Sequence, residues 1–325
     1  MHIDKRIIKR KLNLNEQNTI SYGDHRSGWS FAINSIKDLH NPDGIFFDSF
    51  IERTFCWSPE GIQPNLIPWI GVIHVPPKVP EWFSYENSND FIFSSQEWKE
   101  SLPFCKGLYT LSKYHMKNLA TKVNAPVNSL IHPTEEPSVK WSWNRFHQNK
   151  DKKVIQVGFW LRKLYSIYFL EAKNYQKIFL RKKGDFIDEL LKKEREFSEY
   201  KEIINDEILR TTSTITYLPN EEYDRLLTEN IVFLDLYDAS ANNSIIECMV
   251  RNTPILVNAI EPVIEYLGSD YPFYFKNLEE AALKLADMEL IKETHEYLKY
   301  NPMKKKLSGS YFRKSIIVSD IYRNI

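Results

Sequence analysis

The sequence predicts an α/β protein with two doubly wound parallel sheets in two domains. Two consecutive series of short apolar strands and helices run along the 325 residues. A polar stretch, residues 136–152, separates the two series, with Pro133 just before it and Pro137 near its start. A chain of this length is long enough for two such domains.

The first series begins with a β-like run at 19–21, a glycine-bearing loop at 22–29 and a helical pattern at 30–39. Apolar strands are expected at 45–47, 69–74 and 107–111. Ser112 is the expected N-cap of a helix over 113–122. We therefore assign residues 1–135 to an N-terminal domain.

The second series repeats this alternation of strands and helices. Strands are expected at 153–157, 179–181, 215–218, 231–234 and 254–257, with helices at 164–172, 185–209, 221–228, 244–251 and 278–288. We assign residues 153–300 to a C-terminal domain, with 136–152 as a linker. Residues 301–325 are expected to form a helix that crosses back to the N-terminal domain.

Composition narrows the classes of partner. Lys plus Arg and Asp plus Glu both number 43, and this zero net charge argues against nucleic acid. Short lysine runs leave open a peripheral contact with a membrane surface. The N-terminus lacks the apolar region of a signal peptide, and no apolar run is long enough to span a bilayer. Three cysteines without metal-like spacing favour a reducing compartment, so a cytoplasmic location is expected.

The most informative segment is residues 235–258, which is expected to run strand, small polar loop, helix, strand. Asn242 and Asn243 end the loop and the helix starts near Ser244, so its free N–H groups and positive dipole end suit a diphosphate bound by these three residues. Glu247, one turn later, offers a carboxylate to the two hydroxyls of a ribose. The alternatives are a simple N-cap loop and an exposed glutamate paired with Arg251.

This segment resembles the donor domain of GT-B glycosyltransferases, especially the group of glycogen- and sucrose-synthase-like enzymes. The resemblance rests on Ile-Glu-Cys-Met-Val at 246–250 and Asn-Thr-Pro-Ile-Leu at 252–256. Gln-Val-Gly-Phe-Trp-Leu-Arg-Lys at 156–163 is similar to the first strand and turn of that domain, and residues 106–115 and 260–268 also match in pattern.

The resemblance implies two Rossmann-like domains that face a cleft, with the donor in the C-terminal half. It also implies that Glu247 holds the nucleotide ribose and that Arg162 and Lys163 contact the donor diphosphate. Retaining members of the group have a second glutamate eight residues before the ribose glutamate. That position is Ala239 here, so retention and inversion of the sugar both stay open.

An inverting reaction needs a general base beside the acceptor hydroxyl. Asp24 is the first choice and His74 the second, with His25 and Asp48 also placed at strand ends. In a retaining reaction no base is needed, and His74 or His25 would hydrogen-bond the donor sugar. No Asp-x-Asp metal motif follows a strand, so metal independence is expected, with no cofactor beyond the donor substrate.

The sequence therefore predicts a cytoplasmic glycosyltransferase of hexosyl or pentosyl groups, of the kind used in polysaccharide biosynthesis. Its partners would be a nucleotide sugar and a glycan, lipid-linked or protein acceptor. A sugar-nucleotide epimerase and a non-catalytic binding protein of the same fold are the alternatives. Trp57, Trp69, Trp82 and Phe83 are a candidate stacking surface for an acceptor glycan, or else part of a proline-braced loop.

Overall fold

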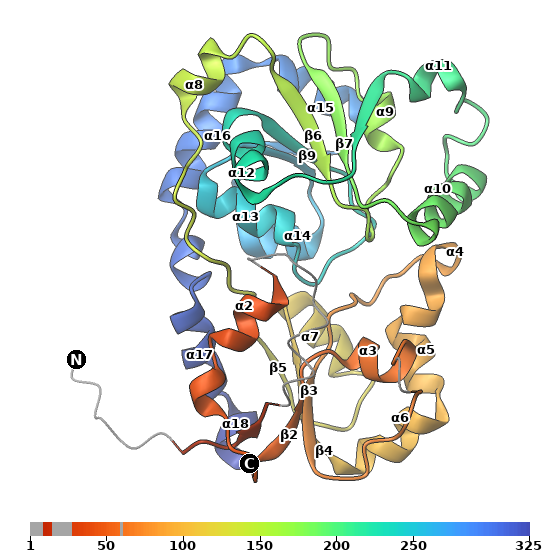
Figure 1. Ribbon diagram of the computed structural model, residues 1–325, viewed down its shortest axis with the longest axis vertical. Helices are drawn as coiled ribbons and strands as arrows, with labels where there is room; N and C mark the ends of the chain where they lie inside the picture. Colours follow the sequence, from red (N-terminus) through yellow and green to blue (C-terminus); the bar gives the residue numbers. More distant parts are fainter. Residues whose placement is uncertain (1–8, 15–27, 59–60) are drawn as a thin grey trace. The chain divides into compact units, whose positions relative to one another are not determined.

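The computed structural model describes residues 9–14, 28–58 and 61–325 (Figure 1). The chain divides into two compact units. Unit 1 comprises Met1–Pro77, Glu86–Glu135 and Lys305–Ile325, and unit 2 comprises Lys78–Tyr85 and Glu136–Lys304. Each unit has its own parallel sheet, so the α/β fold with two Rossmann-like domains expected from the sequence is confirmed.

The sheet of unit 1 has five parallel strands in chain order. These are β1 (Leu12–Asn13), β2 (Ile45–Asp48), β3 (Trp69–Val72), β4 (Cys105–Thr110) and β5 (Val127–Ser129). Trp69 and Leu108 are wholly buried and pack with Ile51, Phe55 and Trp98 in one core cluster. The short apolar runs of β3 and β4 form strands because both of their faces lie under helices.

The described helices of unit 1 include its C-terminal pair. They are α2 (Trp29–Asn34), α3 (Ile51–Cys56), α5 (Asn89–Ser94), α6 (Gln96–Ser101), α7 (Lys113–Leu119), α17 (Gly309–Val318) and α18 (Asp320–Asn324). Gly107 lets α18 lie directly on β4, because a Cβ there would come within 2.6 Å of Ile321. Tyr109 Oη and Ser319 Oγ are 2.7 Å apart in the same contact.

The sheet of unit 2 has six parallel strands whose order reverses once. From edge to edge the strands are β11 (Tyr274–Phe275), β10 (Ile255–Asn258), β9 (Ile231–Leu234), β6 (Lys153–Val157), β7 (Gln176–Leu180) and β8 (Thr212–Ile215). This is the doubly wound dinucleotide-binding order, with its switch point between β6 and β9. Ligands of such sheets bind at the carboxyl ends of the strands beside that point.

Helices lie along both sides of this second sheet (Figure 1). They are α8 (Trp143–Gln148), α9 (Ser166–Phe169), α10 (Asp185–Phe197), α11 (Asp206–Leu209), α12 (Asn220–Glu229), α13 (Asn243–Arg251), α14 (Glu261–Leu267), α15 (Leu278–Ala286) and α16 (Met288–Tyr300). Unit 2 also holds α4 (Glu81–Ser84), which comes from the first half of the sequence.

Two boundaries differ from the sequence expectation. Residues 136–152 are part of unit 2 and not a separate linker, because Trp141 is buried and its Nε1 donates to the carbonyl of Asn230 at 2.9 Å. Residues 78–85, expected in the N-terminal domain, belong to unit 2, where Phe83 is wholly buried.

Candidate functional site

The loops after β6 and β9 are joined by backbone hydrogen bonds at the switch point. Lys163 N donates to the carbonyl of Asp235 at 2.7 Å, and Tyr237 N donates to the carbonyl of Leu161 at 3.0 Å. The two loops therefore form one rim at the carboxyl edge of the sheet. Such an edge is where open α/β sheets bind ligands.

The loop after β6 adopts left-handed backbone at two positions. Gly158 has φ of 79° and Leu161 has φ of 53°. Glycine tolerates this region at no steric cost, whereas leucine rarely adopts it. The side chain of Arg162 folds back onto this loop. Arg162 Nε donates to the Val157 carbonyl at 3.1 Å, and Arg162 Nη1 donates to the Trp160 carbonyl at 2.6 Å.

Arg162 also reaches the N-terminus of α13. Its Nη2 lies 3.3 Å from Asn242 Oδ1 and 3.2 Å from Ser244 Oγ. Burial lowers the pKa of Arg162 to about 10, which still leaves the guanidinium charged at neutral pH. The structure therefore brings Arg162, Asn242 and Ser244 together, although 80 residues separate the first two in sequence.

The start of α13 is capped by its own chain. Asn242 Oδ1 accepts hydrogen bonds from Ser244 N at 3.1 Å and Ile245 N at 3.4 Å, as an N-cap residue does. Asn243, the first helical residue, is exposed. The N-cap explanation of this loop thus holds, and Arg162 adds a fixed positive charge to it.

Glu247 is buried one turn into α13, with 1% of its surface exposed. Its Oε2 accepts a hydrogen bond of 2.5 Å from the hydroxyl of Tyr223 on α12. The alternative of an exposed glutamate paired with Arg251 is wrong, because Arg251 Nη2 bonds Asp224 Oδ1 at 2.7 Å. Tyr223 and Asp224 were not singled out from the sequence, since only the packing of α12 on α13 brings them here.

Lys163 has a different partner from Arg162. Its Nζ lies 3.6 Å from Asp235 Oδ2, which also accepts from Ser166 Oγ at 2.8 Å. About a third of the Lys163 side chain is exposed. Lys163 therefore lies on the rim of the site with its charge already matched by a carboxylate.

The residue before Ala239 is Asp238. Its Oδ2 accepts from Lys78 N at 2.9 Å and its Oδ1 from Ala239 N at 2.9 Å. Ala239 itself is buried. Asp238 thus ties the loop after β9 to the segment 78–85 within unit 2.

The four aromatic residues proposed as one stacking surface do not form one cluster. Trp69 is wholly buried in the core of unit 1, and Trp57 is 44% exposed. Trp82 and Phe83 pack in unit 2, where Phe83 lies 5.2 Å from Trp160 and Trp82 lies 5.5 Å from Tyr237 between ring centroids. Burial and the division into units decide this arrangement, and neither is visible in the spacing of aromatics.

Unit 1 has its own group of polar residues at the carboxyl ends of β2 and β3. His74 Nε2 lies 3.0 Å from the carbonyl of Ser49, and its ring stacks on Phe50 with centroids 4.1 Å apart. Burial lowers the pKa of His74 to about 3, so the imidazole is uncharged at neutral pH and a weak proton acceptor. Asp24 and His25 lie outside the described residues.

Glu52 holds the loop that contains His74. Its Oε1 accepts from the backbone N–H of His74 at 2.8 Å and of Val75 at 2.6 Å. Burial raises the pKa of Glu52 to about 7 and that of Asp48 to about 6. Both carboxyl groups come after the apolar residues of β2, and this place after a strand is the only feature of the sequence that indicated them.

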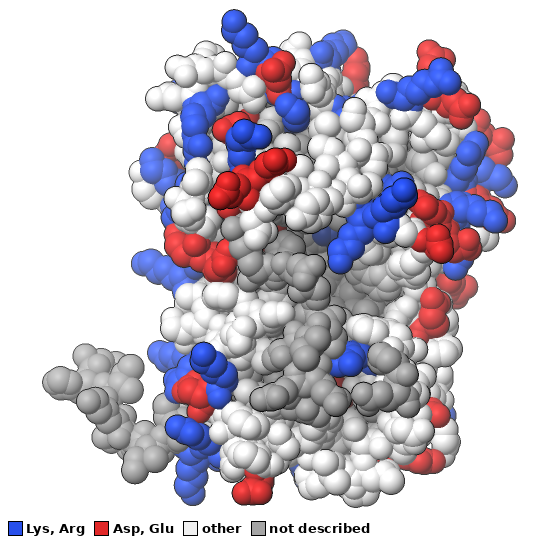
Figure 2. All heavy atoms as spheres, viewed as in Figure 1, with Lys and Arg blue, Asp and Glu red and all other residues white. Residues whose placement is uncertain are grey.

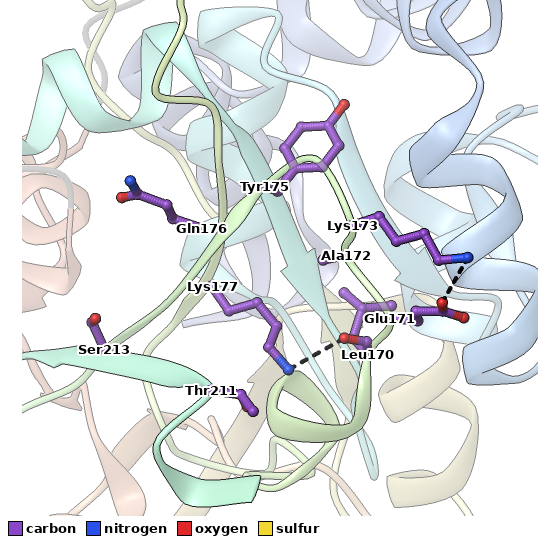
Figure 3. Close-up of a pocket in the computed structure, with 9 residues that line it drawn as sticks. All are labelled: Leu170, Glu171, Ala172, Lys173, Tyr175, Gln176, Lys177, Thr211 and Ser213. Atoms are coloured by element: carbon purple, nitrogen blue, oxygen red, sulfur yellow. Dashed lines mark hydrogen bonds and ion pairs between the residues drawn. The ribbon is translucent and has the colours of Figure 1, made fainter. Parts of the chain in front are cut away.

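A hollow of about 480 Å³ lies elsewhere in unit 2 (Figure 3). Its walls are the loop 170–175, the first residues of β7 including Lys177, and Thr211 and Ser213 at the start of β8. Lys177 Nζ donates there to the carbonyl of Leu170 at 3.3 Å. These are the amino ends of the strands, so the hollow is separate from the rim at Arg162.

Charge is mixed on the face drawn in Figure 2, where Lys and Arg alternate with Asp and Glu over the coloured residues of both units. Within residues 9–14, 28–58 and 61–325, no helix is long and apolar enough to cross a membrane. The same residues contain no group of three or more His, Cys, Asp or Glu side chains arranged to hold a metal ion.

Comparison with known proteins gives a fold and no close relative. The sequence matches no protein-family model, and no curated protein matches it. Solved structures do match. Sucrose-phosphate synthase from Thermosynechococcus elongatus has a TM-score of 0.56 and 11% identity, over 79% of this chain and 67% of that one.

Two further matches are similar. An α,α-trehalose-phosphate synthase (UDP-forming) from Burkholderia vietnamiensis has a TM-score of 0.56 and 9% identity, over 90% of this chain and 76% of that one. TarM from S. aureus, in a complex that includes UDP, has a TM-score of 0.51 and 12% identity, over 79% and 50%. The chain therefore has the two-domain α/β fold of these GT-B proteins.

Proposed function

We propose that the chain is a glycosyltransferase that moves a sugar from a nucleoside-diphosphate sugar to a glycan, lipid-linked or protein acceptor, without a metal ion. The observation that carries this proposal is the environment of Arg162. Among the described residues, its guanidinium contacts four oxygen atoms that are all uncharged: two backbone carbonyls, Asn242 Oδ1 and Ser244 Oγ. A cation held this way at a helix N-terminus favours an anionic ligand such as a diphosphate.

The other proposed donor contacts lie on the same rim. Ser244 and Asn242 would share the diphosphate with Arg162, and Lys163 would approach it from the edge. Glu247, one turn into α13, would accept hydrogen bonds from the ribose hydroxyls. When the glycosidic bond breaks, charge builds up on the leaving diphosphate, and Arg162 with the positive end of α13 would stabilise it.

Unit 1 would contribute hydrogen-bonding groups to the transferred sugar or the acceptor. His74 suits this as an uncharged imidazole whose ring is fixed by Phe50 and Ser49. Its low pKa makes it a poor general base, so Asp24 and His25 are the proposed bases of an inverting reaction. A retaining reaction would need none of them.

A second function is favoured by the surroundings of Ala239. Retaining members of the resembled group have a glutamate there, whereas the neighbouring Asp238 is bonded to the backbone of Lys78 and Ala239. A protein that binds nucleotide sugars without turnover fits this observation. The site of Arg162 and Glu247 would be the same in both cases.

The test begins with nucleotide binding. UDP is the first probe, since two of the structural neighbours are described with it, followed by GDP and ADP. Wild-type chain is expected to bind one of them in calorimetry, and Arg162→Met is expected to bind it ten- to a hundredfold more weakly, because a charged hydrogen bond to phosphate is lost. Arg210→Met, an exposed residue just after α11, is the matched control.

Turnover then separates the functions. Release of UDP from UDP-glucose or UDP-N-acetylglucosamine that depends on an added acceptor indicates a transferase. Release of a free epimeric sugar without acceptor indicates an epimerase, and binding without release indicates a binding protein. A wild-type chain that binds no nucleoside diphosphate, or an Arg162→Met variant with normal affinity, would contradict the proposed site.

A further inference from the structure

The contact between Tyr223 and Glu247 joins two helices at the candidate nucleotide site. Tyr223 lies on α12, and its hydroxyl donates to Glu247 Oε2 on α13 at 2.5 Å. The next residue along α12, Asp224, bonds Arg251 one turn further along α13. A hydrogen bond and an adjacent ion pair therefore fix how the face of α13 that bears Glu247 packs against α12.

The Tyr223 hydroxyl is a hydrogen-bond donor at neutral pH. Burial and the neighbouring Glu247 carboxylate raise the pKa of Tyr223 well above its ordinary value. The phenol therefore keeps its proton, and it can only donate to the carboxylate. A donor of this kind fixes one oxygen of the carboxylate in space.

The hydrogen bond from Tyr223 also restrains the Glu247 side chain. A glutamate side chain that is held in one rotamer loses less conformational entropy when a ligand binds.

We infer that Tyr223 is a specificity-determining residue of this site, which positions the Glu247 carboxylate so that a ribose diol is bound in preference to a deoxyribose. This inference rests on the proposed function. The ligand class is a ribonucleoside diphosphate, and the selection acts on the sugar hydroxyls of the nucleotide. Tyr223 acts through Glu247 and is a positioning residue.

The experiment measures binding of UDP, 2′-deoxy-UDP and 3′-deoxy-UDP to the full chain by calorimetry. Wild type is expected to prefer UDP. Tyr223→Phe keeps the ring and removes the hydroxyl, so UDP should bind about tenfold more weakly while the two deoxy analogues change little. Glu247→Gln should abolish the preference, and adding Tyr223→Phe to it should have no further effect on the preference.

A matched control comes from the other edge of unit 2. Tyr274→Phe also removes one partly buried hydrogen bond, from Tyr274 Oη to the Gly268 carbonyl at 2.9 Å, and should leave all three affinities unchanged. Melting temperatures of the variants confirm that each is folded.

Two results would overturn the inference without touching the proposed function: Tyr223→Phe binds UDP as wild type does, or it weakens all three ligands equally. If wild type binds none of UDP, GDP, ADP and their deoxy analogues, the proposed function is wrong as well. If wild type binds UDP and the deoxy forms equally, the ribose role of Glu247 and the inference fall together, while the diphosphate role of Arg162 stands.

Discussion

The carboxyl edges of the two sheets differ in one group: unit 2 has an arginine there, and the described residues of unit 1 have carboxyl groups and a histidine. In unit 2 the edge holds a charged guanidinium, Arg162, that contacts uncharged oxygens. In unit 1 the edge holds the carboxyl groups of Asp48 and Glu52, whose pKa values burial raises to about 6 and about 7, together with an uncharged His74.

The difference has a chemical consequence. A fixed cation beside a helix N-terminus selects an anion, whereas carboxyl groups and a neutral imidazole offer hydrogen bonds to hydroxyl groups. The edge of unit 2 therefore suits an anionic group, and the edge of unit 1 suits hydroxyl groups; the proposed function assigns these to the donor diphosphate and to a sugar. Four changes can break or sharpen this comparison.

The largest expected effect comes from the buried ion pair that supports the edge of unit 2. Arg251→Met leaves Asp224 charged and buried, which is expected to destabilise the fold by about 3–5 kcal/mol. The midpoint of urea unfolding measures it. Lys122→Met, which breaks the more exposed pair with Asp90 in unit 1, should cost less than about 1 kcal/mol. Equal effects would show that burial does not distinguish the two pairs.

The second change tests the titration of Glu52 in unit 1. Its pKa is about 7 in the folded state against 4.5 as an ordinary glutamate, so folding favours the protonated form. Its contribution to stability is full below pH 4.5 and is lost as pH rises to 7, by about 3 kcal/mol in all. Glu52→Gln keeps an oxygen for the His74 and Val75 N–H groups and removes the titration.

The measurement is the free energy of unfolding of wild type and Glu52→Gln between pH 4.5 and 8. The free energy of unfolding of the variant should increase relative to that of wild type as pH rises. His74 contributes with the opposite sign, since its lowered pKa costs stability as pH falls below 6.5, but it is common to both proteins and cancels in the difference. A difference that is constant with pH contradicts the assignment.

The third change separates capping from anion binding in unit 2. Asn242→Ala removes the acceptor for Ser244 N and Ile245 N and should cost about 1 kcal/mol of stability. Asn242→Asp keeps the cap and adds a negative charge beside Arg162, so stability is retained while UDP binding weakens. Ser112→Ala, which removes the cap of α7 in unit 1, should lower stability by a similar amount and leave UDP binding unchanged.

The smallest effect is expected at Gly158, which packs against the Arg162 guanidinium. Gly158→Ala imposes left-handed backbone on alanine, at about 1 kcal/mol, and its Cβ would come within 3.2 Å of the guanidinium. Gly61→Ala carries the same backbone strain in unit 1, with no atom of the described residues within 4 Å of the new Cβ. Melting temperatures should fall alike, but only Gly158→Ala should weaken UDP binding.

Long apolar runs were predictable from the sequence. The strands expected at 45–47, 107–111, 153–157 and 231–234 are β2, β4, β6 and β9, and Ser112 caps α7 through its bond to His115 N at 3.2 Å. Strands β1, β5 and β11 were missed because two or three residues carry no periodicity. The helix expected at 164–172 is only α9, Ser166–Phe169. The strand expected at 19–21 lies outside the described residues.

The sequence by itself determined the α/β alternation, a helix that starts within one residue of the observed start of α13 at Asn243, and the presence of Glu247 one turn later. These depend on local patterns: apolar runs, a capping side chain and helical spacing. Only the tertiary structure decided the partners of these groups. Tyr223 reaches Glu247 from 24 residues away and Arg162 reaches Asn242 from 80, because parallel strands bring distant loops to one edge of a sheet.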